Sequence, residues 1–363
     1  MNNYIRVLIL NLIVGFFLLG FVTDVEAKKK PRELWFTFSP ELNITYDSNV
    51  FLYSPDDLDA FVKRQNASQF AAITTYDDLI YTQSMKGYVY YRWNADNLSR
   101  LRINLRQRNY AINTQKSYYS AAFHLRQYYH PLGYIQLGYF YLPQYHIRHI
   151  YDADTGNYEP CDFENQLFSV KFNLDWNRTD FEIGYEYEIT DYNRYFEEYD
   201  NEADSFLFKV TRPINRQARI MAGYEFKQQI ADAIDEPGED YRTSDDGDIS
   251  YDQNIFRLGI KGFRIGQFPW QFSTEYSYRF REYTTENKRD SFHFEREDTG
   301  HEFIVKSANT FFKRWTVVFG YEFDKRDVDS AAKSDITDVK NYQKHIFSLS
   351  LNFDYDTTIL RKN

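Results

Sequence analysis

Strict alternation of apolar and polar side chains constrains this chain more than any other feature. In 347–355 every second residue is Phe, Leu or Tyr, and the residues between them are Ser, Asn or Asp. In 181–189 the polar face carries Glu182, Glu186 and Glu188. A period of two indicates a β-strand with one apolar and one polar face. Three glutamates on one face require water on that side of the sheet, because burying unpaired charge is costly.

The connections between these segments are alternately short, as at 94–97 and 177–179, and long, as at 47–77 and 148–164. This pattern, with an even number of strands, is typical of bacterial outer-membrane β-barrels and puts both termini in the periplasm. Sixteen strands is the alternative, because Phe70–Tyr81 could form a further one. The fourteen expected strands are 34–46, 78–93, 98–109, 117–129, 133–147, 165–176, 180–191, 203–212, 216–229, 253–263, 269–283, 299–310, 314–325 and 343–355.

Composition supports the same fold class. Aromatic residues make up 19% of the chain, yet 26% of its residues are charged. Beyond the N-terminal segment no apolar run approaches the length of a membrane-spanning helix. A closed barrel is then the remaining spanning structure, with apolar residues toward lipid and polar residues toward the lumen. We therefore predict an all-β, antiparallel, up-and-down transmembrane barrel in the outer membrane of a Gram-negative bacterium.

The N-terminal segment has the features of a signal peptide. Arg6 precedes an apolar run over 7–22, and Val25-Glu26-Ala27 gives small or medium side chains at the −3 and −1 positions of a cleavage site. A transmembrane anchor is the alternative, but it needs a longer run. We expect 1–27 to be a cleaved signal peptide and 28–363 to form the barrel.

Several classes of site are disfavoured by the sequence. The single cysteine, Cys161, excludes a disulfide within the chain and any site built from several cysteines. A net charge of −10 makes nucleic acid an improbable partner. The acidic stretches 152–159 and 245–248 resemble calcium loops, but neither completes the twelve-residue pattern. We expect no metal and no cofactor.

Side-chain parity predicts a row of cations inside the barrel. Leu101, Ile103 and Leu105 must face lipid, because a charge at mid-bilayer costs about 2–4 kcal/mol on that face. Their alternates, and residues of the same parity on neighbouring strands, then face the lumen, with Arg92 expected roughly opposite Arg100. The predicted basic ladder comprises Arg92, Arg100, Arg102, Arg106, Arg108 and Arg126.

The same argument turns acidic residues inward from other strands. The opposing lumenal acids are Asp175, Glu182, Glu186, Glu188 and Glu322. One interpretation is a polar pathway with a transverse field, or a binding face for an anionic polymer. The alternative is that arginines and acids neutralise each other across a filled lumen.

Two further predictions concern the membrane edge and catalysis. All five tryptophans lie near proposed periplasmic ends, which predicts an aromatic girdle there. Among the seven histidines, His124 shares a strand face with Ser120, but the two would be roughly 13 Å apart. That exceeds hydrogen-bond reach, so we predict that the chain is not an enzyme.

The segment Tyr46-Asp47-Ser48-Asn49-Val50-Phe51 resembles a turn found after the first strand in a family of β-barrel porins. That family includes outer-membrane proteins associated with exopolysaccharide export, and Tyr76–Ile80 is similar to the acidic start of its second strand. The resemblance implies an outer-membrane barrel serving polysaccharide passage, without transferable site residues. A second resemblance is to barrels that move or modify surface lipoproteins, but those usually begin with a helical-repeat domain.

These observations favour a porin-like channel or conduit for polar or anionic solutes or for exported polysaccharide. The alternative is a non-conducting structural or assembly barrel whose lumen is plugged, for instance by the loop 47–77. The expected partners are outer-membrane lipid, lipopolysaccharide, the barrel-assembly machinery and an anionic solute or polysaccharide.

Overall fold

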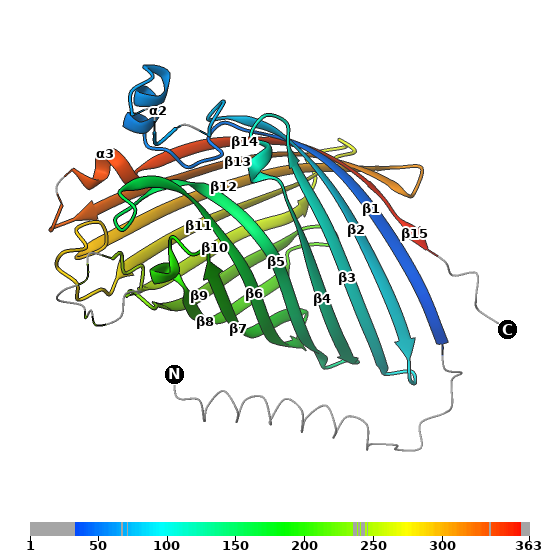
Figure 1. Cartoon of the computed structure of the whole chain (residues 1–363). Helices are drawn as coiled ribbons and strands as arrows, with labels where there is room; N and C mark the ends of the chain where they lie inside the picture. The colour runs from blue at the N-terminus through cyan, green and yellow to red at the C-terminus, as the bar shows by residue number, and fades with distance from the viewer. Residues whose placement is uncertain are drawn as a thin grey trace.

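A computed structural model describes residues 33–356 except 67, 71, 235–237, 239, 241–243, 245 and 334. Within these residues the chain forms one closed sheet of fourteen long antiparallel strands, each paired with its neighbours in sequence (Figure 1). The predicted signal peptide lies outside the described residues. The strands are β1 (Glu33–Asp47), β2 (Asp78–Arg92), β3 (Asn97–Tyr110), β4 (Tyr118–Tyr129), β5 (Gly133–Asp152), β6 (Asn157–Trp176), β7 (Thr179–Tyr192), β8 (Asn201–Pro213), β9 (Arg219–Ala231), β10 (Tyr251–Phe263), β11 (Gln271–Tyr283), β12 (Arg296–Phe311), β13 (Trp315–Ser330) and β14 (Tyr342–Phe353).

Pairing of the first and last strands closes the barrel. β1 pairs with β14 from Glu41 opposite Asn352 to Asp47 opposite Ile346. A short β15 (Tyr355–Asp356) continues this pairing beside Thr37 and Phe38. The prediction of a fourteen-strand up-and-down barrel is confirmed. Sixteen strands is wrong, because the described part of 48–77 contains the helix α2 (Pro55–Val62) and no strand.

The two ends of the barrel differ. Long connections gather at one end, the loop end, together with α2 and α3 (Ile336–Lys340), while the start of β1 and β15 lie at the other, the turn end (Figure 1). Two 3-10 turns, η1 (Thr114–Lys116) and η2 (Glu197–Tyr199), also belong to loop-end connections. No helix in the described residues is long and apolar enough to cross a membrane.

The wall has an apolar outer face and a polar inner face. On β14, Phe347, Leu349 and Leu351 are 53%, 41% and 38% exposed, and their alternates point inward. Toward the loop end, tyrosine hydroxyls on the outer face bond to polar neighbours, such as Tyr321 to His345 at 3.0 Å. This outer surface has the form of a lipid-facing belt with a polar edge.

One predicted loop is instead a hairpin. The range 148–164 was expected to be a long loop, but β5 and β6 extend through most of it and turn at 153–156. The Asp152 carboxylate accepts hydrogen bonds from the backbone N–H and the hydroxyl of Thr155, and Gly156 has a φ of +66°. The acidic stretch 152–159 thus contains the tight turn of this hairpin, although its polar composition is typical of a long loop.

The tryptophan prediction is wrong for Trp35. Its neighbours Leu34 and Phe36 are exposed on the outer face, so strand alternation turns Trp35 into the lumen. There its ring stacks on Tyr90, with 4.9 Å between ring centroids. The other four tryptophans lie at or just beyond the turn-end limits of their strands, where Trp176 and Trp315 are 68% and 41% exposed.

The Tyr46–Phe51 segment has a structural role. Asn49 donates from Nδ2 to the Tyr53 carbonyl and accepts from the Tyr53 N–H, which curls the chain back at the end of β1. Val50, Phe51 and Tyr53 then enter a buried loop-end cluster with Phe70, Ile80 and Tyr110. The cluster anchors the connection 48–77 to the rim of the barrel.

Candidate functional site: the two walls of the lumen

The strand register places the six ladder arginines on the inner face of β2, β3 and β4. Leu101, Ile103 and Leu105 lie on the opposite face, paired with other outward residues such as Phe123. We call this region the arginine wall, comprising Arg92, Arg100, Arg102, Arg106, Arg108 and Arg126. The expected position of Arg92 opposite Arg100 is wrong, because Arg92 pairs with Leu98 and Arg100 lies between Tyr90 and Arg126.

Near the turn end, Arg92 pairs with Glu33 at 3.6 Å, whereas aromatic rings take the place of counter-ions around Arg100 and Arg126. The Arg126 guanidinium lies 3.7 Å from the centroid of the Tyr134 ring and donates from Nη2 to Gln136 Oε1 at 2.6 Å. Arg100 lies between the rings of Tyr88 and Tyr128, at 5.7 and 5.5 Å. Cation–π contacts explain how Arg100 and Arg126 tolerate direct cross-strand pairing of like charges.

At mid-height the arginine wall has no such compensation. In the part of the chain that the structure describes, Arg102 and Arg106 make no ion pair, no side-chain hydrogen bond and no ring contact. Arg106 is exposed within the lumen and lies between Ser84 and Ser120 on the flanking strands. The Nε atom of Arg102 is buried without a partner. These two guanidiniums are therefore free to meet a mobile anion.

The predicted lumenal acids lie inward, and two of the five, Glu186 and Glu188, are neutralised by lysines on neighbouring strands. Glu186 pairs with Lys171 at 2.9 Å and Glu188 with Lys227 at 2.6 Å. Further pairs join Arg257 to Glu225, Lys261 to Glu275 and Arg279 to Asp324. We call this region, on β6 to β13, the paired wall. Its lysines were missed by the sequence analysis, although the same parity argument could have found them.

The other predicted acids have different surroundings. Glu182 accepts a hydrogen bond from the Tyr134 hydroxyl at 2.6 Å. Asp175 lies directly opposite Asp180 at the turn end of the β6–β7 hairpin. Glu322 has no cation within ion-pair distance among the described residues, and its cross-strand neighbours are Ile304 and Ile346. None of these acids pairs directly with an arginine of the arginine wall.

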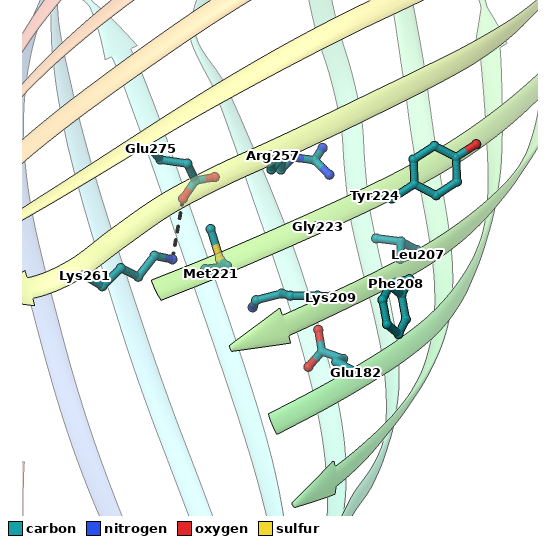
Figure 2. A pocket seen from close by; sticks show the side chains of 10 residues that line it. All are labelled: Glu182, Leu207, Phe208, Lys209, Met221, Gly223, Tyr224, Arg257, Lys261 and Glu275. Carbon is teal, nitrogen blue, oxygen red and sulfur yellow. Dashed lines mark ion pairs between the residues drawn. The ribbon is translucent and has the colours of Figure 1, made fainter. Parts of the chain in front are cut away.

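Two cavities open on the paired wall toward the turn end. The smaller, of about 160 Å³, is lined by Glu182 and Lys209 on one side and by Lys261, Glu275 and Arg257 on the other (Figure 2). The larger, of about 370 Å³, shares Glu182, Lys209 and Lys261 and extends toward Arg219. The larger cavity also has Asp175 and Asp180 in its lining, so the acidic and basic side chains around each cavity nearly balance and the net charge is small.

Burial of the inner face increases toward the loop end. On β10 the Lys261 side chain near the turn end is 53% exposed, whereas Ile255, Gln253 and Tyr251 are each 6% exposed. The lumen is thus open at the turn end and narrowed by packed side chains and connections at the loop end. Among the described residues, no group of three or more His, Cys, Asp or Glu side chains is placed to hold a metal ion.

The prediction that the chain is not an enzyme does not hold. The structures that match this fold include a loop L8 deletion mutant of OmpT, an outer membrane protein of Vibrio cholerae, with 8% identity, a TM-score of 0.46, and 90% of this chain and 100% of that chain covered. Because one fold serves unrelated functions, the barrel fold neither establishes nor excludes enzymatic activity.

Comparison with known proteins gives only distant structural similarity. No family model matches the chain, and no curated protein matches it in sequence. A bacterial polysaccharide outer membrane secretin is similar with 9% identity and a TM-score of 0.45, covering 87% of this chain and 98% of that chain. The outer membrane channel DcaP of Acinetobacter baumannii is similar with 11% identity and a TM-score of 0.45, covering 91% and 99%.

Proposed function

We propose that this protein is an outer-membrane channel that favours anionic solutes. Arg102 and Arg106 have no counter-ion among the described residues, whereas most acids of the paired wall pair with a cation. This contrast between the two walls is the observation that carries the proposal. Fixed charge beside an aqueous pathway attracts counter-ions and repels co-ions. On the arginine wall the uncompensated charge at mid-height is positive, and on the paired wall Glu322 is an acid without a cation partner among the described residues.

The outer face supports location in a membrane. Apolar side chains stay exposed around the barrel, including Leu42 on β1, Ile183 on β7 and Leu258 on β10, at 57%, 60% and 60%. An exposed apolar face this extensive needs a lipid environment. The loop end then faces outward and the turn end faces the periplasm.

An anionic polysaccharide is the finer form of the proposal. Near the turn end, Trp35, Tyr88, Tyr90 and Tyr128 project into the lumen beside Arg92 and Arg100. Aromatic faces next to guanidiniums suit a flexible chain that carries both apolar ring faces and acidic groups. The turn end would be its entry from the periplasm.

A plugged, non-conducting barrel is the second candidate, and burial at the loop end favours it. Single-channel recording in planar bilayers separates the two. We expect discrete currents and a reversal potential that indicates anion preference at about 0.1 M salt, weakening near 1 M as the screening length falls from about 10 to about 3 Å. Absence of any conductance from correctly folded protein would contradict the channel.

A further inference from the structure

The two cavities on the paired wall adjoin and form one hollow near the turn end, because both are lined by Glu182, Lys209 and Lys261. We call it the turn-end hollow. The strand register explains why the sheet is hollowed here. Lys209 lies between Glu182 and Gly223 on the flanking strands, and the glycine adds no side chain to the inner face. Figure 2 shows the charged side chains of four strands around this part of the wall.

The turn-end hollow contains hydrogen-bonding groups that the protein itself does not use. Lys209 makes no ion pair and no side-chain hydrogen bond among the described residues, although it lies directly opposite Glu182. Asn173 and Thr211 also have no side-chain hydrogen bond within the described part of the chain. The Glu182 carboxylate has one described hydrogen bond, which the Tyr134 hydroxyl donates to one of its two oxygens at 2.6 Å. Donors and acceptors are therefore available side by side.

This mixture of groups matches a ligand with many hydroxyl groups. A hydroxyl donates one hydrogen bond and accepts up to two, so it needs partners of both kinds. A small anion would use only the donors, and a cation only the acceptors. The larger cavity also has equal numbers of acidic and basic side chains, namely Asp175, Asp180 and Glu182 against Lys209, Arg219 and Lys261. Recognition in the hollow therefore depends on hydroxyl groups more than on net charge.

Aromatic and apolar side chains line another part of the hollow. The rings of Tyr128 and Tyr134 line the larger cavity and meet edge to face, with 5.6 Å between their centroids, and Met221 lines it as well. A pyranose ring carries hydroxyl groups at its edge and C–H groups on its faces, so polar groups beside aromatic rings complement both. The larger cavity, of about 370 Å³, is within the range of ~300–1,000 Å³ typical of small-ligand sites.

We propose that the turn-end hollow binds one pyranose ring of a polysaccharide through its hydroxyl groups, whether or not that sugar is charged. The inference deepens the polysaccharide form of the proposed function and rests on it for the natural ligand. The Arg126 guanidinium lies over the Tyr134 ring at 3.7 Å, so the hollow borders the arginine wall. An acidic group on the same polysaccharide could then meet the arginine wall while a sugar ring occupies the hollow.

Titration of the purified full-length protein with uncharged oligosaccharides tests the hollow. The probes are hexasaccharides of glucose, galactose and mannose, in a detergent without a sugar head group, and saturation-transfer NMR detects binding. We expect saturable binding of at least one probe. Its affinity should not change between about 0.1 and about 1 M salt, because the probe carries no charge to be screened. Binding of an anion at Arg102 and Arg106 would weaken over the same range.

Two substitutions should weaken binding without unfolding the barrel, because both side chains lie on the inner face. Lys209→Met removes the ammonium donors but keeps the length of the side chain, and should weaken binding about tenfold, or about 1.4 kcal/mol. Thr211→Phe fills the larger cavity and should abolish binding. The matched control is Lys306→Met, because Lys306 is an inner-face lysine without an ion pair among the described residues and lines neither cavity. Migration of unheated samples on gels verifies folding.

Two results would overturn the hollow as a sugar site. One is absence of saturable binding by every uncharged probe, even if an acidic oligosaccharide binds. The other is a folded Lys209→Met/Thr211→Phe variant that binds a probe as tightly as the wild type, which would place the sugar elsewhere, for instance on the stacked rings of Trp35 and Tyr90. A barrel that binds sugar without conducting contradicts only the channel, and one that conducts without binding contradicts only the hollow.

Discussion

The arginine wall and the paired wall line the same lumen, but their charges are balanced in different ways. On the paired wall a lysine or arginine from the adjacent strand meets most acids, as Lys171 meets Glu186 at 2.9 Å. On the arginine wall, the rings of Tyr88, Tyr128 and Tyr134 make cation–π contacts with Arg100 and Arg126 near the turn end. Arg102 and Arg106 have no such contact and no counter-ion among the described residues. The electrostatic field beside each wall therefore depends more on which charges are paired than on how many charges the wall carries.

The largest expected effect comes from placing a charge on the outer, lipid-facing side of the arginine wall. Ile103→Lys would place an ammonium against lipid beside Arg102, at a cost of about 2–4 kcal/mol at mid-bilayer. We expect loss of the folded, heat-modifiable band on gels, whereas Ile103→Val should assemble normally. Normal assembly of the lysine variant would mean that the inner and outer faces are assigned the wrong way round.

A stability comparison between the walls should give an intermediate effect. Glu186→Ala leaves Lys171 without its partner and should lower the free energy of unfolding by about 1–3 kcal/mol. Arg106→Ala removes a side chain that has no partner among the described residues, and it should change the free energy of unfolding by less than about 0.5 kcal/mol. Equilibrium denaturation of vesicle-inserted protein, followed by tryptophan fluorescence, measures both. Equal losses would show that Arg106 has a structural partner.

The smallest effect should come from the rings of the arginine wall. Tyr88→Leu removes one of the two rings around Arg100 and should cost about 0.5–1 kcal/mol of unfolding free energy. Tyr88→Phe keeps the ring face and serves as its control. If the leucine and phenylalanine variants are equally stable, cation–π contact does not compensate Arg100.

Sequence periodicity predicted much of this fold, because an alternating strand shows its two faces directly in the residues. Strand number, order and the facing of Arg102 or Glu186 follow from that pattern. Pairing does not, since it depends on register: a shift of two residues between β2 and β3 put Arg100 opposite Tyr90 instead of Arg92. The β5–β6 hairpin was missed because its turn is held by the Asp152 carboxylate within a polar segment.

The central claim is that unpaired charge, not total charge, sets the field in the lumen. Two double variants, each removing two charged side chains, test it: Arg102→Ser/Arg106→Ser on the arginine wall and Lys171→Gln/Glu186→Gln on the paired wall. The measurement is the reversal potential of single channels in a salt gradient at low ionic strength. We predict that the first variant loses its anion preference and that the second retains the wild-type value. A first variant with unchanged selectivity, or a second that shifts as far as the first, would contradict the account.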